Sequence, residues 1–494
     1  MPYAANARRV SSIEYRPRRP EESLLHRVVR DHLETFVARE AERGGSLPRF
    51  VDRELRKFVA CGSPALGFVR VRCTECGHDR AVPFSCKGRG CCSSCGGRRM
   101  SETAARLVDR VLPRVPIRQW VLSLPRPLRY RLAYNADLCS AVLGVFLRAV
   151  FGWLRRRAKR AGVSDGQPGA VTQIQRFGSA INLNLHLHSL VLDGVYTEVE
   201  GRARFRRLPP PTQRDIEKLC ATIARRARRL LVRRGLADES AVDALGDQEP
   251  LLAGVCSASI QGLVATGDRA GGAVQRVGDE VDDDESSARP ARLCAQVAGF
   301  NLQAAVAVPA RDRRRLETLC KYISRPPIAA ERLSELPDGR LAYELKKRWS
   351  DGTTHMIFRP TELIEKLVAL VPAPQKNLLR YHGVLAARAR LRPQVVAAAH
   401  PDPPVPNEAV APERPVTLGR PGRYMPWAEL LKRVFQSDVL CCPRCGGRMK
   451  IIATLTKPSV VAAFLRSVGV SADPPRFAPP TRPPPPPLVD PVPS

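Results

Sequence analysis

The 494-residue sequence contains no run of eighteen apolar residues, so it predicts no membrane-spanning helix. Its first twenty residues, MPYAANARRVSSIEYRPRRP, lack the apolar segment of a secretory signal. It also lacks a G-x-x-x-x-G-K-[ST] phosphate-binding loop, which is typical of ATP-consuming enzymes. From these absences we expect a cytoplasmic protein whose activity needs no ATP.

Acidic side chains are few relative to basic ones. The chain has 80 Lys and Arg residues against 48 Asp and Glu residues, a net charge of +32 and a pI near 10.4. Arginine dominates the excess, and its planar fork matches phosphate, so the composition indicates a polyanionic partner, most simply nucleic acid. A GC-rich genome would explain arginine over lysine, but it would not explain the net charge.

The fifteen cysteines indicate metal sites or free thiols rather than disulfides, because disulfides are rare in a reducing compartment. Two C-x2-C pairs are separated by fifteen residues, which is the spacing of a two-knuckle zinc site. The alternative is that these cysteines bind no metal. We expect a closed structural zinc site on Cys73, Cys76, Cys92 and Cys95. Spare candidates, which could replace one of these or build a second site, are Cys61, Cys86 and His78.

Basic residues surround the cysteine pairs and recur in the strand before residue 178. A small zinc module with a basic rim suits contact with the phosphates of duplex or hairpin DNA. The alternative is a basic surface that is merely solvated. The residues that we expect to bind DNA are Lys87, Arg89, Arg98, Arg99 and Arg176.

Residues 181–188 alternate strictly between apolar and polar side chains, which predicts a strand with two different faces. His186 and His188 share the polar face, roughly 6.6 Å apart at their backbones, so both can reach one metal ion. Residues 171–177 predict the neighbouring strand of a hairpin, on which Gln173 and Gln175 share a face. We expect Gln175, which is nearer the turn, to be the third ligand. The alternative is a solvated face with two incidental histidines.

Residues 311–323 predict a short helix with an apolar stripe of Leu316, Leu319, Cys320 and Ile323. Tyr322 lies outside this stripe, roughly 110° from its centre, so its side chain should point to the basic edge of the helix. A tyrosine at such a boundary often only packs its ring. The sequence therefore leaves a structural and a chemical role open.

The remaining pattern predicts an α+β fold: an antiparallel sheet flanked by helices, preceded by a helical and zinc-binding module. Residues 1–20 should form a basic, flexible N-terminus, 21–112 the zinc-binding domain and 113–400 the catalytic domain, with an acidic, disordered loop near 237–290. We further expect a proline-rich linker at 401–421, a separate module at 422–470 and an unpacked proline-rich tail at 471–494. The C-terminal module has one knuckle, Cys442 and Cys445, without a visible second pair.

Seven ordered motifs across about residues 20–460 make the chain resemble the insertion sequence 91 family of transposases, rolling-circle enzymes of the HUH endonuclease superfamily. They are FSCKGRG at 84–90, RRM at 98–100, QWVLSLP at 119–125, QRFGSA at 175–180, the His-x-His strand, Tyr322 before RPP at 325–327, and RYHG at 380–383. The chain departs from the family pattern at Cys91 and Ser93, where phenylalanine and proline are expected.

The resemblance implies that His186 and His188 bind the catalytic metal and that Tyr322 is the nucleophile. In founding members two tyrosines lie four residues apart, but Thr318 occupies the earlier position here, as in the single-tyrosine branch. The implied cofactors are Mg2+ or Mn2+ at the histidines and structural Zn2+ at the cysteines. The implied partners are single-stranded or hairpin DNA at element ends and target DNA, with no membrane, and two protomers could act in turn.

Two other functions remain open at this point. A plasmid replication initiator or relaxase would share the chemistry but serve a replicon. A non-catalytic zinc protein, such as an inactive relic of a transposase, would bind DNA without forming a covalent adduct.

Overall fold

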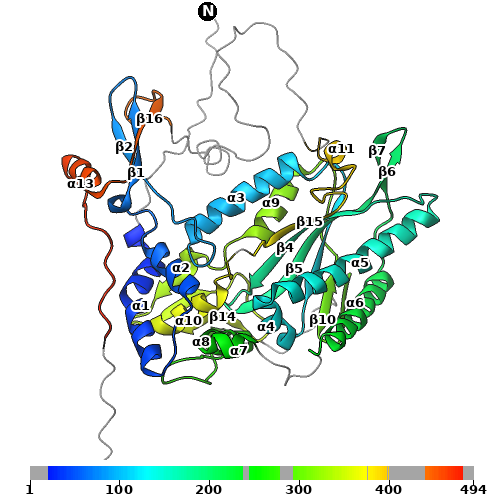
Figure 1. Cartoon of the computed structure of the whole chain (residues 1–494), viewed down its shortest axis with the longest axis horizontal. Helices are drawn as coiled ribbons and strands as arrows, with labels where there is room; N and C mark the ends of the chain where they lie inside the picture. Colours follow the sequence, from blue (N-terminus) through cyan, green and yellow to red (C-terminus); the bar gives the residue numbers. More distant parts are fainter. Residues whose placement is uncertain are drawn as a thin grey trace, which may run out of the picture.

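The computed structural model describes residues 20–236, 244–278, 293–374, 376–397, 399 and 440–481. These residues form a seven-stranded antiparallel sheet with helices on both faces, an N-terminal helical module and three smaller sheets, one of them a two-stranded hairpin (Figure 1). The expected α+β class with an antiparallel sheet is confirmed.

The central sheet is organised around β5, which lies between β4 and β3. Its strand order is β15-β4-β5-β3-β10-β9, and β11 pairs with β3. Leu183, Leu185 and Leu187 of β5 are buried on one face, as their alternation predicts, while Leu190 and Leu192 are buried on the other. The strands are β3 (Ile117–Ser123), β4 (Gly169–Phe177), β5 (Leu183–Leu192), β9 (Cys294–Val297), β10 (Phe300–Gln303), β11 (Ala307–Val308) and β15 (Leu379–Gly383).

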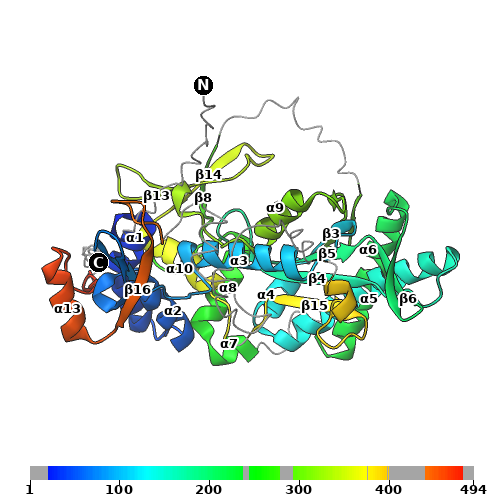
Figure 2. The same ribbon diagram turned by 90° about the horizontal axis from the view of Figure 1, so that it is seen from above.

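Helices cover both faces of this sheet (Figures 1 and 2). On one face, α3 (Ser93–Arg110) and α9 (Arg313–Ser324) bury a core with side chains of β4 and β5. On the other face lie α4 (Arg126–Tyr134), α5 (Ala136–Arg160) and α6 (Gln213–Arg233), which share one core with Leu183, Leu185 and Leu187 of β5. The histidine face of β5 is therefore the face of α3 and α9.

The C-terminal segment joins the N-terminal module instead of forming a separate one. Strand β16 (Met449–Leu455) pairs with β1 (Phe68–Cys73), whose other neighbour is β2 (Asp79–Pro83). This sheet lies beside α1 (Leu24–Glu42), α2 (Arg49–Val59) and α13 (Pro458–Ser467) (Figure 1). The described part of the tail also packs, because Ala478 N donates to Arg30 O at 3.1 Å. The expectations of a separate module and of an unpacked tail are wrong for these residues.

The other elements surround this frame. A four-stranded sheet has the order β12-β13-β14-β8, and β6 and β7 form a hairpin. These strands are β6 (Gly194–Val199), β7 (Arg202–Arg207), β8 (Gln275–Gly278), β12 (Leu333–Glu335), β13 (Leu341–Glu344) and β14 (Thr353–Phe358). The helices are α7 (Ala244–Gln248), α8 (Pro250–Gln261), α10 (Pro360–Leu370) and α11 (Arg392–Ala397), with 3-10 turns at Pro20–Glu22, Pro64–Leu66 and Ala330–Arg332.

The expected disordered loop near 237–290 is wrong for residues 244–278. Helix α8 is largely buried, and Glu365 on α10 accepts hydrogen bonds from the backbone N–H groups of Ala265 and Thr266 at 2.9 and 3.0 Å. Glu365 also accepts from Lys366 Nζ at 2.6 Å, and both side chains are nearly inaccessible to solvent. The acidic run at 279–285, the 401–421 linker and the N-terminal residues 1–19 lie outside the described residues.

Helix α5 is long and apolar enough to cross a membrane by length and composition. Its most apolar window is, however, 67% buried inside the protein, where it covers the leucine face of the sheet. A buried core helix passes the same test, so this helix does not indicate a membrane protein.

The Glu365–Lys366 pair provides a test of this packing. We expect Glu365→Ala to lower the free energy of unfolding by about 3–5 kcal/mol, because it leaves a buried ammonium without its counter-charge. Asp268→Ala is the control, because its ion pair with Arg359 is exposed and should contribute about 0–1 kcal/mol. Urea unfolding of both variants measures the difference, and equal small effects would contradict the structural role of Glu365.

Candidate active site and cysteine clusters

The two histidines of β5 face one another on the side of the sheet covered by α9. Their ring centroids are 4.7 Å apart. In the register of the β4–β5 hairpin, Gln175 lies opposite His186 and Gln173 opposite His188. The structure therefore brings both expected histidines and both candidate glutamines to one face.

Hydrogen bonds orient both imidazoles. The Nδ1–H of His186 donates to the carbonyl oxygen of Asn184 at 2.8 Å. Nδ1 of His188 lies 2.8 Å from Nε2 of Gln119. With the carboxamide turned by 180°, Oε1 takes the place of Nε2 and accepts the Nδ1 proton. In this arrangement both Nε2 atoms keep a lone pair, as metal-binding histidines require.

Both imidazoles are neutral at physiological pH. Burial, opposed by the hydrogen bond to Asn184 and assisted by the Arg325 and Arg129 guanidinium groups, lowers the pKa of His186 to about 4. Burial, His186 and Arg325 hold the pKa of His188 well below its usual range. Neutral imidazole is the form that binds metal ions.

Two buried polar atoms near the histidines have no hydrogen-bond partner among the described residues. They are His188 Nε2 and Gln175 Oε1, whereas Gln175 Nε2 donates to the carbonyl of Ile323 on α9 at 3.3 Å. Leaving such atoms unpaired costs roughly 1–3 kcal/mol each. A cation between them would satisfy both, so these residues fit a divalent metal ion.

Tyr322 on α9 lies next to this pair. Its ring centroid is 5.9 Å from that of His188, at an interplanar angle of 87°, and its side chain is 39% exposed. The guanidinium of Arg325 lies 5.1 Å from the ring centroid and Nζ of Lys346 lies 5.5 Å from it. Thr318 lies one turn earlier, and its hydroxyl donates to the Arg314 carbonyl. Tyr322 is the one tyrosine of α9.

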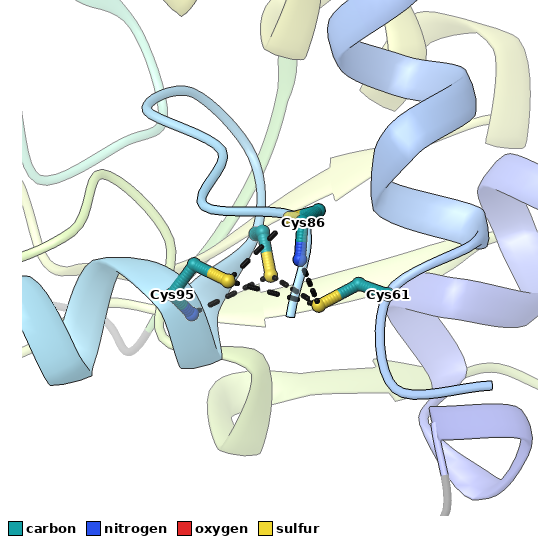
Figure 3. Close-up of side chains that lie close together, drawn as sticks. Cys61, Cys86 and Cys95 are labelled. Atoms are coloured by element: carbon teal, nitrogen blue, oxygen red, sulfur yellow. Dashed lines mark hydrogen bonds between the residues drawn. The ribbon is translucent and has the colours of Figure 1, made fainter. Parts of the chain in front are cut away.

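Four sulfur atoms gather where α3 begins (Figure 3). The Cys86–Cys95 sulfurs are 3.4 Å apart, and Cys61 Sγ lies 3.7 Å from the sulfurs of Cys92 and Cys95. Hydrogen bonds from Cys86 and Cys92 lower the pKa of Cys61 to about 6. The geometry and the thiolate character suit a tetrahedral Zn2+ ion.

A second cluster joins distant parts of the chain. Cys73 Sγ lies 3.5 Å from Cys445 Sγ, and Cys76 Sγ lies 3.6 Å from Cys442 Sγ. The expected single site on Cys73, Cys76, Cys92 and Cys95 is therefore wrong in its grouping, because the two pairs belong to different clusters. Of the spare candidates, Cys61 and Cys86 complete the first cluster, while His78 belongs to neither.

The first cluster adjoins the tyrosine helix through α3. Cys92 caps α3 by accepting from Cys95 N at 3.5 Å. In the next turn, a Cβ on Gly96 would lie 2.6 Å from Cβ of Pro326, just past the end of α9. This close approach requires glycine and ties the cysteine cluster to the position of α9.

The residues expected to bind DNA have different environments. Lys87 and Arg89 are exposed, Arg98 is half-buried, and Arg99 donates to the carbonyl oxygens of Lys87 and Gly88. Arg176 is 5% exposed, stacks 4.8 Å from the Tyr134 ring centroid and donates to the Ala133 carbonyl. The expectation that Arg176 binds DNA is therefore wrong for this conformation, because its side chain is buried and contacts Tyr134 and Ala133.

Gln119, Arg325 and Lys346 are site residues that the sequence did not single out. Gln119 and Arg325 stand in motifs at 119–125 and 325–327, but a motif does not say which side chain touches which. Lys346 follows β13 and reaches the site only through the tertiary fold. Distances in the folded chain were needed to find all three.

Two family models match the chain. The transposase model Y2_Tnp matches residues 169–392, which include both histidines and Tyr322, and the "Transposase zinc-binding domain" model Zn_Tnp_IS91 matches residues 28–124. The chain belongs to the insertion sequence 91 family of transposases. Its substrate is accordingly DNA, and the match to the zinc-binding domain together with the cysteine clusters supports structural Zn2+. The searches of curated proteins and of solved structures found no match. Neither matched range of this transposase reaches Cys442 or Cys445.

The cluster assignment predicts the zinc content of the protein. We expect two zinc ions per chain, and we expect Cys442→Ser and Cys61→Ser each to remove a different one, because each cluster loses a ligand. Elemental analysis of the purified full chain measures the content. Cys441→Ser and Cys91→Ser are matched controls, adjacent in sequence but outside both clusters. One zinc ion in the unsubstituted chain, lost on Cys92→Ser and on Cys73→Ser alike, would restore the single-site grouping.

Proposed function

We propose that this transposase nicks and rejoins single-stranded DNA at transposon ends through a 5′-phosphotyrosine intermediate, in rolling-circle transposition. The observation that carries the proposal is the position of Tyr322, whose ring lies against His188 and beside two unpartnered metal-ligand atoms. A partly exposed tyrosine hydroxyl next to a cation site is the arrangement that attack on a phosphodiester needs.

His186, His188 and Gln175 would hold one Mg2+ or Mn2+ ion. When bound, this ion supplies Lewis-acid polarisation of a phosphate oxygen. The residues of the chain supply the remaining parts: two neutral imidazoles, a buried amide oxygen, and the hydrogen bonds to Asn184 and Gln119 that orient the rings.

In the nicking step, Tyr322 Oη forms a bond to phosphorus while the bond from phosphorus to the 3′ oxygen breaks. The phenol loses its proton, and the leaving oxygen takes one up to become a free 3′-OH. Arg325 and Lys346 lie beside the tyrosine ring, where positive charge stabilises the phosphate as charge builds up on it. The phosphotyrosine bond retains the energy of the phosphodiester, so attack by a 3′-OH reverses the step without ATP.

The substrate strand should be single-stranded or extruded, because its phosphate must reach a tyrosine held between α9 and the sheet. A single tyrosine per active site leaves one covalent attachment per protomer at a time. Two protomers acting in turn would complete the transfer, and a homodimer crosslinked in solution would support this; its absence under all conditions would count against it.

Tyr322→Phe tests the nucleophile. We expect the full chain to form a denaturant-resistant adduct with labelled single-stranded element-end DNA in Mg2+ or Mn2+, and the variant to form none, because the attacking oxygen is missing. Tyr381→Phe is the matched control, since Tyr381 lies on β15, on the far side of β4 from β5. An adduct that survives in Tyr322→Phe but is lost in Tyr381→Phe would move the nucleophile to β15.

Gln175→Ala tests the third ligand. We expect it to raise the Mn2+ concentration for half-maximal adduct formation by roughly tenfold or more, because an oxygen ligand is lost. Gln173→Ala should have little effect, because Gln173 Nε2 donates to the Ile174 carbonyl and its side chain is only partly buried. A larger loss in Gln173→Ala than in Gln175→Ala would reverse the assignment.

A further inference from the structure

A large groove lies away from the tyrosine, between helices α4, α5 and α6 and the turn that joins β9 to β10. Its volume is about 1040 Å³, and we call it the arginine groove. Seven arginines line it, and its described lining includes no aspartate or glutamate. Six of these arginines are exposed: Arg148, Arg225, Arg226, Arg228, Arg229 and Arg233.

The charge of the groove is not neutralised by the described part of the protein. None of the six exposed arginines forms an ion pair with a described residue, whereas Arg157 on α5 pairs with Asp215 near the start of α6. Five arginines within nine residues of one helix repel each other and attract a polyanion. The groove therefore favours a ligand with several closely spaced negative charges.

Apolar side chains lie between the arginines. Val232 is 57% exposed, Leu231 is half-buried, and both line the groove together with Phe300. Exposed apolar surface beside guanidinium groups matches a ligand that presents both phosphates and flat apolar faces. Single-stranded DNA has this chemistry, because its bases are not covered by a partner strand. A duplex presents mainly its phosphates to a groove of this kind.

The groove lies on the face of the sheet opposite the histidines, and one end of it lies beside the end of β3. Pro125 of the lining follows β3, in which Ser123 lies opposite His186 on one side and Asn301 on the other. Phe300 of the lining precedes Asn301 directly. Two strand spacings, roughly 10 Å, therefore separate the backbone of His186 from the edge of the groove. A strand that leaves Tyr322 would reach the groove by passing around the ends of β3 and β10 to the other face of the sheet.

We infer that the arginine groove binds the single-stranded DNA that flanks the cleaved phosphate and so holds the element end in the active site. The flanking role rests on the function proposed above, whereas the binding of single-stranded DNA by the groove can be measured without any chemistry. The contacts would be arginine to phosphate at the rim and apolar packing of bases on the floor.

The test uses the full chain carrying Tyr322→Phe, so that binding is measured without covalent capture. In this background, Arg225→Ala, Arg229→Ala and Arg233→Ala are combined. The matched control combines Arg214→Ala, Lys218→Ala and Arg234→Ala, which remove the same charge from the same helix region outside the groove lining. Fluorescence anisotropy with a labelled single-stranded oligonucleotide and with the corresponding duplex, over a range of salt concentrations, gives Kd and its salt dependence.

We expect the groove variant to bind the single strand about tenfold or more weakly and the slope of log K against log salt to fall by about 2, because three phosphate contacts are lost. The control variant should change Kd by less than about threefold, and duplex binding should change less than single-strand binding. Equal losses in the two variants, or a larger loss for the duplex, would overturn the inference.

The same variants separate this inference from the proposed function when Tyr322 is restored. If the adduct forms at the unsubstituted level in the groove variant and single-strand binding is unchanged, the groove inference fails while the nicking function stands. If no protein forms an adduct but single-strand binding is still lost only in the groove variant, the groove inference stands for binding and the nicking function fails.

Discussion

The alternation of side chains along β5 is the constraint on which the rest of the structure depends. Leu183, Leu185 and Leu187 belong to the larger core with α5, and the same alternation places His186 and His188 on the opposite face. Because β5 is hydrogen-bonded to β4 on one side and to β3 on the other, His186 is fixed in register with Gln175 and Ser123, and His188 with Gln173 and Val121. A shift by one residue would exchange core and site. Burial of the apolar side chains and the position of the histidines therefore require the same register of β5.

The cysteine clusters extend this rigidity to the helices around the site. One cluster lies at the start of α3, where Gly96 approaches Pro326 and so restrains the end of the tyrosine helix. The other joins residues 366 positions apart and holds β16 against β1. A metal ion that joins such distant segments stabilises the fold chiefly by restricting the unfolded chain and by linking metal binding to folding. The N-terminal module is thus built from both ends of the described chain.

The features that could be predicted from the sequence are those that local pattern determines. The histidine strand, its hairpin partner and the tyrosine helix follow from period-two and period-3.6 repeats. The expected grouping of Cys73, Cys76, Cys92 and Cys95 is wrong because C-x2-C spacing identifies a knuckle but does not show which other cysteines bind the same metal ion. The turn between β9 and β10 does not follow from the side-chain pattern, because Ala298 and Gly299 both adopt positive φ, which alanine rarely does. Helix α8 was missed because it is apolar on most sides and shows no amphipathic period.

The most direct test of the central claim is to identify the residue that becomes attached to DNA. The full chain is incubated with single-stranded element-end DNA and Mn2+, the adduct is digested with nuclease and protease, and the nucleotide-bearing peptide is sequenced by mass spectrometry. The account predicts a nucleotide attached through its 5′ phosphate to Tyr322, and no such peptide when the divalent ion is chelated. Attachment to any other residue, or at a 3′ phosphate, would contradict the assignment of this site as a 5′-phosphotyrosine nuclease.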